Sequence, residues 1–220
     1  MTTPFSQKSD DIQSGNHTLL YQTHSPFARK ALVFALECGL GDRIEVIHQE
    51  TSPTNRNDRV FRANPLGKVP VLILENGATI FDSPVIIDFL NQMGRGPDLF
   101  AHEELPVHEL RTLFALSNGV LDAALLSVLE LRRPEQEQSV MWLERWRENI
   151  LAGVGLMAQR FAQLGTQDNM ASLSFGVALD YLMFRLPDID WRTRHPDLTI
   201  WAAEQLKRPV FTNTDPRQST

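Results

Sequence analysis

The chain has 220 residues, of which 42% are hydrophobic and 22% are charged, with a net charge of −6 at pH 7 and a single cysteine. These values are typical of a globular protein that holds one large or two small domains. The negative charge argues against nucleic acid or an anionic membrane as the main partner, and the longest apolar stretch, residues 150–158, is too short to cross a bilayer. We therefore expect a cytoplasmic enzyme or binding protein.

The chain begins with a polar, aperiodic segment, residues 1–17, which predicts a mobile extension. Strand-like and helix-like segments then alternate. Ser25-Pro26 supplies a helix N-cap followed by proline at the first helical position, and Gly39 favours the end of that helix. The elements expected here are a strand at 18–22, a helix from 26 to 38, a strand at 44–48 and a short polar helix within 55–63.

The next stretch predicts a hairpin followed by a helix. Residues 69–74 are β-branched and apolar, and residues 78–81 fit a return strand. Asn76-Gly77 between them favours a tight type I′ turn. Ser83-Pro84 repeats the N-cap and proline pattern and opens a second helix, with Ser83 as the expected cap.

The order β-α-β-α-β-β-α, a parallel pair joined by a helix and then a hairpin, is the thioredoxin-like arrangement. Gly and Pro in residues 94–98 mark a linker, after which only helical periodicity remains. We therefore predict an α/β thioredoxin-like domain followed by an all-α helical bundle. The expected parts are a mobile extension at 1–17, the thioredoxin-like domain at 18–93, a linker at 94–103 and the helical domain at 104–216, with helices over 105–132, 135–162, 172–185 and 196–208.

Three local features point to a ligand. Each serine–proline helix start offers unpaired N–H groups and a partial positive charge, which suit an anion, and in this topology both helices open at the same edge of the sheet. Asp82, next to Ser83, suits an ammonium group of the same ligand. Pro70, at the start of a strand, fits either a trans edge position or a cis bond that turns the Val69 peptide groups outward.

The sequence resembles the cytosolic glutathione transferases. Residues 64–72, Asn-Pro-Leu-Gly-Lys-Val-Pro-Val-Leu, followed by Asp82-Ser83, look like the glutathione-binding half of that family, and residues 178–185 match its late helices. The start Ser25-Pro26-Phe27 is similar to that of bacterial and plant serine-type members. One departure is at residues 169–172, where the family usually has a Ser/Thr-x-x-Asp capping box, so we expect slightly weaker helix initiation.

The resemblance implies that glutathione binds as a co-substrate and that Ser25 acts in catalysis by donating a hydrogen bond to its thiolate. From position alone, Ser25 fits a simple helix cap equally well. The resemblance also implies that the proline is cis and that the preceding residue pairs with the glutathione backbone. The residues it places on glutathione are Phe27, Lys68, Val69, Pro70, Asp82 and Ser83.

The implied reaction is attack of the thiolate on a small hydrophobic electrophile, with Phe114 and Ser117 as expected walls of the second-substrate pocket. Two other functions fit the same residues: a glutathione-dependent disulfide reductase, which usually needs a cysteine where Ser25 stands, and a non-catalytic glutathione-binding or protein-interaction module. Cys38 is expected to be a buried structural thiol. No histidine spacing suggests a metal site, and the resemblance implies a symmetric homodimer.

Overall fold

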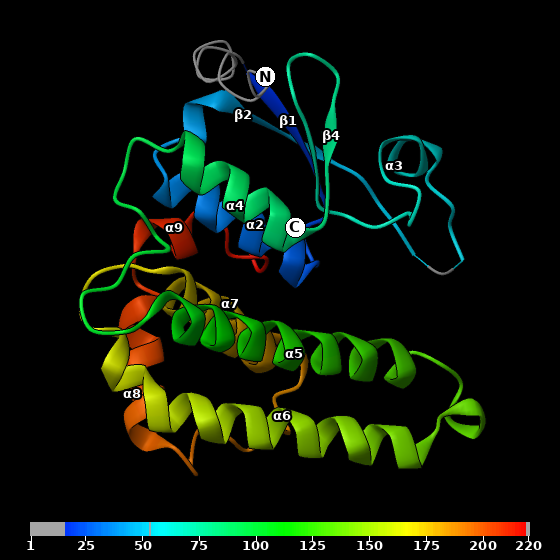
Figure 1. Ribbon diagram of the computed structural model, residues 1–220. Coiled ribbons are helices and arrows are strands. Elements are labelled where there is room, and N and C mark those ends of the chain that lie inside the picture. Colours follow the sequence, from blue (N-terminus) through cyan, green and yellow to red (C-terminus); the bar gives the residue numbers. More distant parts are fainter. Residues whose placement is uncertain (1–15, 53, 219–220) are drawn as a thin grey trace, which may run out of the picture. The chain divides into compact units, whose positions relative to one another are not determined.

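The computed structural model describes residues 16–52 and 54–218, so residues 1–15 of the predicted extension lie outside it. His17, which was predicted to belong to that extension, is instead the first residue of a strand and is buried. The described residues divide into two compact units (Figure 1). The first contains the described residues up to Asp98 and those from Thr214 onward, and the second is Leu99–Asn213.

The first unit is built on a four-stranded sheet in the order β2-β1-β3-β4. The central strand β1 pairs in parallel with β2 and antiparallel with β3, which in turn pairs antiparallel with β4. This mixed sheet confirms the predicted thioredoxin-like topology. The strands are β1 (His17–Tyr21), β2 (Ile44–His48), β3 (Val71–Ile73) and β4 (Thr79–Ile80).

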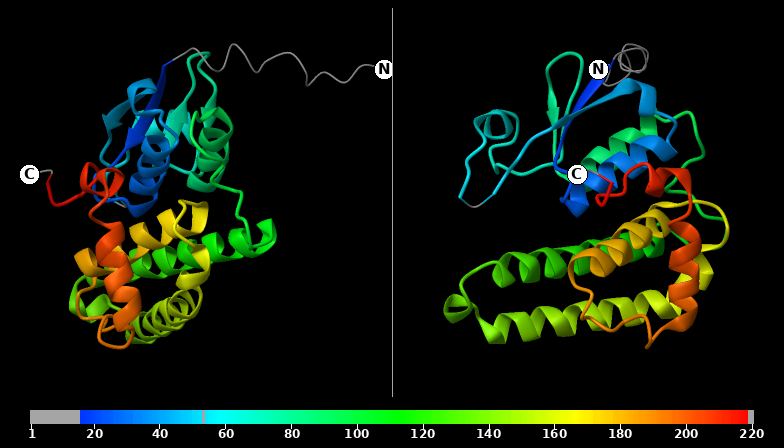
Figure 2. Two further views of the ribbon diagram at one scale, coloured as in Figure 1. Left: turned by 90° about the vertical axis from the view of Figure 1, so that its left-hand side faces the viewer. Right: turned by 180° about the vertical axis from the view of Figure 1, so that it is seen from behind.

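Two helices, α2 (Pro26–Glu37) and α4 (Ser83–Met93), pack side by side, as Figures 1 and 2 show from different directions. Their apolar faces and the central strand form the core of the unit, in which Leu20, Phe34 and Ile86 are fully buried. The remaining helices are the short α3 (Asp58–Ala63) and a 3-10 turn at Gly41–Arg43.

The β3–β4 turn differs from the predicted type I′ turn. That turn needs positive φ at both central residues, whereas Gly77 (φ 82°) has positive φ and Asn76 does not. The Gly77 N–H donates to the Leu74 carbonyl, and the Leu74 N–H donates to the Ala78 carbonyl. The loop therefore has three residues, a type I turn closed by a left-handed glycine, and the strands are shorter than predicted.

The second unit is helical, as predicted. The long helices α5 and α6 run alongside one another, and α7 packs on α5 (Figure 2). Residues 170–182 of α7 are all buried. The elements are α5 (Val107–Leu131), a 3-10 turn (Glu135–Glu137), α6 (Val140–Arg160), a 3-10 turn (Phe161–Leu164), α7 (Met170–Arg185), α8 (Pro196–Gln205) and α9 (Pro209–Thr212).

The start of α7 has a complete capping box despite the missing aspartate. The Asn169 side chain accepts from the Ser172 N–H, and the Ser172 hydroxyl accepts from the Asn169 N–H at 3.1 Å. Asn169 is also buried and donates to the Leu164 carbonyl. Serine thus supplies the reciprocal bond, so the reason for expecting weaker helix initiation does not apply.

Within the described residues one helix, α5, is long and apolar enough to cross a membrane by length and composition. Half of its most apolar window is buried, and it packs against both α6 and α7. Core helices of water-soluble proteins meet the same criterion.

Candidate active site

The first candidate site residue, Ser25, lies at the N-terminus of α2. The Ala28 N–H donates to its Oγ at 3.3 Å, and Pro26 follows as the first helical residue, so Ser25 caps the helix as predicted. In this bond the hydroxyl is the acceptor. A serine hydroxyl also carries a proton to donate, so capping α2 leaves Ser25 able to donate a hydrogen bond to a bound anion.

The second helix start differs by one residue from the prediction. Asp82, not Ser83, is the N-cap of α4, because the first helical hydrogen bond runs from the Ile86 N–H to the Asp82 carbonyl at 3.0 Å. Ser83 is the first helical residue and Pro84 the second. The Asp82 side chain makes no capping hydrogen bond, so its carboxylate is not used in holding the helix.

The polar groups of Asp82 and Ser83 are available to a ligand. Asp82 is exposed, and its carboxylate forms neither an ion pair nor a hydrogen bond with the described part of the chain. Ser83 is only 2% exposed, yet its hydroxyl has no partner among those same residues. The Ser83 hydroxyl is therefore free to form a hydrogen bond with a ligand.

The Val69–Pro70 peptide bond is cis, the second of the two alternatives that the sequence left open. Val69 precedes the β3 ladder, and neither its N–H nor its C=O is hydrogen-bonded within residues 16–52 and 54–218. Asn64 fixes this loop by donating from its side chain to the Lys68 carbonyl at 2.9 Å. Lys68 itself is exposed, and its ammonium group has no ion pair within those ranges.

The sheet register brings these groups to one edge. Leu20, next to the end of β1, pairs with Val71 at the start of β3, and Leu72 pairs with Ile80 at the end of β4. The chain leaves β1 for Ser25, enters β3 from Val69-Pro70 and leaves β4 for Asp82-Ser83. A helix N-terminus, an unpaired peptide unit, a hydroxyl and a carboxylate therefore share one end of the sheet. Phe27 lies in the first turn of α2, with the Lys30 Nζ 5.1 Å from its ring centroid.

The same edge carries a polar cluster that sequence reasoning missed. Glu50 accepts hydrogen bonds from Gln22 at 2.9 Å and from His48 at 2.6 Å, and Thr51 donates to Gln22 at 2.8 Å. The His48 hydrogen bond is the main cause that lowers the pKa of Glu50. No local sequence pattern indicates this cluster, because its residues come together only where the parallel strands β1 and β2 end side by side at Tyr21 and His48.

Cys38 is a buried structural thiol, as expected. It lies just beyond α2 and is 2% exposed. Burial, aided by the nearby Glu37 carboxylate, raises the pKa of this thiol to about 12. Within residues 16–52 and 54–218 no group of three or more His, Cys, Asp or Glu residues is placed to hold a metal.

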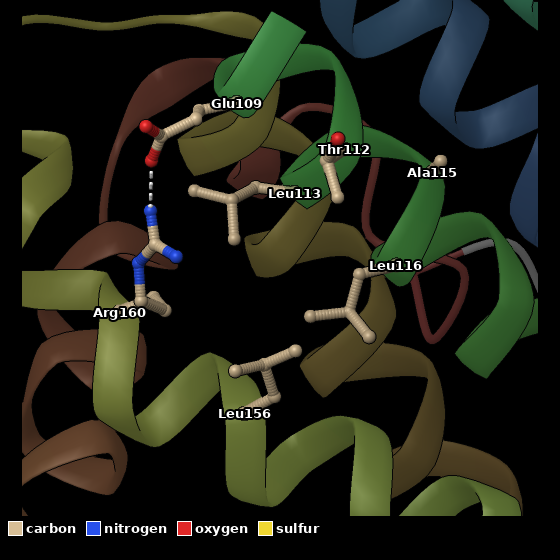
Figure 3. Close-up of a pocket in the computed structure, with 7 residues that line it drawn as sticks. All are labelled: Glu109, Thr112, Leu113, Ala115, Leu116, Leu156 and Arg160. Atoms are coloured by element: carbon tan, nitrogen blue, oxygen red, sulfur yellow. Dashed lines mark hydrogen bonds and ion pairs between the residues drawn. The ribbon is translucent and has the colours of Figure 1, made fainter. Parts of the chain in front are cut away.

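The structure does not bring the two expected second-substrate residues to an open surface. Phe114 and Ser117 are 6% and 0% exposed, and the Ser117 hydroxyl donates to the Phe114 carbonyl at 2.7 Å. A pocket of about 430 Å³ lies instead between other residues of α5 and α6. Its walls carry an ion pair of 2.7 Å between Arg160 and Glu109 (Figure 3). The lining residues are Glu109, Thr112, Leu113, Ala115, Leu116, Leu156 and Arg160.

Residues 24–93 match the family model described as the glutathione S-transferase N-terminal domain. The chain is also 34% identical to an uncharacterized GST-like protein, YibF, of Escherichia coli (strain K12), over 87% of this chain and 95% of that protein. The chain belongs to the glutathione S-transferase family.

Solved structures agree with this membership. A glutathione transferase family member from Pseudomonas fluorescens Pf-5, crystallised with bound glutathione, is 34% identical, with a TM-score of 0.87 over 91% of this chain and 99% of that one. A second structure from that organism contains S-(propanoic acid)-glutathione and matches with a TM-score of 0.82 at 34% identity, over 91% of this chain and all of that one. The chain is accordingly a GST-like enzyme.

Proposed function

We propose that this enzyme binds glutathione at the edge of the sheet that carries Ser25, Val69 and Asp82-Ser83, and activates its thiol for attack on a small hydrophobic electrophile. One observation carries the proposal: the Val69 peptide groups, the Ser83 hydroxyl and the Asp82 carboxylate are all without partners within the described residues. Val69 can pair with a peptide backbone, Ser83 can bind a carboxylate, and Asp82 can bind an ammonium group. Glutathione offers all three.

In this proposal Ser25 holds the sulfur as a thiolate. A free cysteine thiol has a pKa of about 8.5, and lowering it by ~2 units requires only ~2.7 kcal/mol of preferential stabilisation of the anion. One hydrogen bond to a charged acceptor together with a helix N-terminus can supply this energy. The Ser25 hydroxyl proton and the first turn of α2 provide both.

The bound ligands of the neighbours fit such a reaction. The Pseudomonas fluorescens protein crystallised with S-(propanoic acid)-glutathione binds a glutathione whose sulfur carries a further group. A product of this kind forms when a thiolate adds to an electrophile. Buried Cys38, far from the start of α2, does not favour the reductase alternative, whose usual route needs a protein thiol at that start.

The decisive experiment is an ultraviolet titration of bound glutathione, with wild type beside Ser25→Ala. We expect the thiol to ionise well below its free pKa on the wild type and close to its free pKa on the variant. The variant should also lose about 1 kcal/mol of stability, because a helix cap is removed.

A matched control is Ser139→Ala, which removes the serine that caps α6 through the Trp142 N–H. It should lose similar stability and leave the thiolate shift unchanged. Glutathione binding without a pKa shift in the wild type would contradict activation by Ser25 and favour the non-catalytic module. Failure to bind glutathione at all would contradict the proposed site.

We further propose that the enzyme is a symmetric homodimer. The chain mass is 25.0 kDa, so light scattering at micromolar concentration should give about twice this value. A single species of one chain mass would contradict the proposal.

A further inference from the structure

The helical unit has two arginines without an acidic partner near the ends of α5 and α7. Arg132 is the C-cap residue of α5, and Arg185 is the last residue of α7, a helix that packs on α5. Neither guanidinium forms an ion pair within residues 16–52 and 54–218. The neighbouring Arg133 is different, because it pairs with Glu137 at 3.4 Å and lies 3.9 Å from Glu130.

Arg185 is the more constrained of the two. Its side chain is partly buried, and its Nε atom is covered yet has no hydrogen-bond partner. The guanidinium carbon lies 4.4 Å from the centroid of the Phe184 ring. Burial is the main cause that lowers the pKa of Arg185; Tyr181 acts in the opposite direction, and repulsion from Arg132 adds a smaller lowering. A partly buried cation beside a second cation, with no carboxylate to compensate, is the arrangement that a bound anion would relieve.

Tyr181 adds a neutral donor at the same place. It precedes Arg185 by one helical turn, so the two side chains share a face of α7. The residue is 5% exposed, and its hydroxyl has no hydrogen-bond partner among the described residues. Burial raises its pKa, while the positive charges of Arg185 and Arg132 act in the opposite direction. At neutral pH the hydroxyl therefore keeps its proton and can donate it to an anion.

We propose that Arg132, Tyr181 and Arg185 form a binding site on the helical unit for the carboxylate of a small organic acid. A guanidinium presents two parallel N–H donors that match the two oxygens of a carboxylate. The tyrosine hydroxyl adds a further hydrogen-bond donor. The Phe184 ring and Leu131, which is 50% exposed beside Arg132, provide apolar surface for the body of the acid. An inorganic anion would leave this apolar surface unused.

The test is calorimetric titration of the full chain with 3-phenylpropanoate and with its neutral counterpart, 3-phenylpropanamide. We expect the acid to bind at least tenfold more tightly than the amide and more tightly than inorganic sulfate. Equal binding of acid and amide, or no binding of the acid at millimolar concentration, would overturn the proposal. Sulfate binding as tightly as the acid would overturn the assignment to an organic acid.

Variants locate the site. Arg185→Gln should weaken binding of the acid at least tenfold, and Arg132→Gln, an exposed position that carries little risk to folding, should weaken it several-fold. Arg133→Gln is the matched control: it removes one positive charge next to Arg132 from an arginine that already has acidic partners, and should leave the affinity unchanged. If Arg132→Gln has no effect, or if Arg133→Gln weakens binding as much as Arg132→Gln does, the site is not the one proposed. None of these outcomes depends on glutathione binding, so the two proposals fail independently.

Discussion

A single residue at the sheet edge can combine a structural role with the chemical role proposed for it. Ser25 shows this most clearly, because its oxygen accepts the Ala28 N–H while its proton stays free to donate. A hydroxyl can do both at once, so the choice between helix cap and thiol activator is not a choice between exclusive roles. Mutation separates them only when stability and thiolate ionisation are both measured.

His17 should make stability depend on pH. It is 3% exposed, and its Nδ1 accepts the Glu75 N–H at 3.3 Å, which places the proton of the neutral ring on Nε2. Burial, with a further contribution from Arg43, lowers its pKa below 6.5. The unfolded chain then binds this proton more readily than the folded chain. The contribution of neutral His17 to the free energy of unfolding is therefore fully present above pH 6.5. It is lost as the pH falls toward the pKa of His17 in the folded protein.

Urea unfolding between pH 5 and pH 8 measures this effect, with His17→Asn as the comparison. Asparagine can place its side-chain oxygen as an acceptor for the Glu75 N–H but does not titrate. The difference in unfolding free energy between wild type and variant should be constant above pH 6.5 and should shift against the wild type below it. A difference independent of pH across this range would exclude the proposed role of His17.

Among the elements, α5 and α6 approach each other closely at a glycine. A Cβ added at Gly153 would lie 2.4 Å from the Cγ2 of Val120. Gly153 is buried and its neighbour is β-branched, so the side chain has little freedom to move away.

We predict that Gly153→Ala destabilises the protein by about 1–3 kcal/mol through overpacking. Adding Val120→Ala should recover part of this loss, because it removes the methyl group that clashes. The measurement is a double-mutant cycle by denaturant unfolding. Strictly additive effects of the two substitutions would show that the helices do not meet at this pair.

The sequence predicted these elements well and their ends less well. Ser25 was assigned correctly as a cap, because an N-cap depends on a few neighbouring residues. The cap of α4 was predicted at Ser83, one residue too late, since only the Ile86 hydrogen bond to the Asp82 carbonyl identifies the true cap. The predicted turn type was wrong for a similar reason. Asn76-Gly77 fits a two-residue type I′ turn and also a three-residue loop, and the strand pairing decides between these two turns.

The candidate site was only partly readable for the same reason. The residues near Val69 and Ser83 occur in a recognisable local pattern, whereas Gln22 and Glu50 are 28 positions apart and meet through the parallel pairing of β1 and β2. Phe114 follows the helical periodicity of a buried face. Helical periodicity predicts that a side chain is buried, but it does not show whether the side chain faces a ligand pocket or the packed core.

For the whole molecule, its one cysteine should report on opening of the first unit. Cys38 is buried with a pKa of about 12, so at pH 8 very little of it is thiolate. We expect Ellman's reagent to react slowly with the native protein. In denaturing urea it should react promptly with one thiol per chain. Prompt reaction of the native protein would contradict the burial of Cys38.

The first unit is also discontinuous in sequence, because the chain returns to it at Thr214. There the Thr214 hydroxyl accepts a hydrogen bond from Nε of the buried Arg29, one turn beyond Ser25 in α2. A ribosome therefore has to synthesise almost the entire chain before this unit has all its parts. A fragment ending at Asp98 would lack Thr214 and its hydrogen bond with Arg29, so the N-terminal stretch alone does not contain all of the first unit.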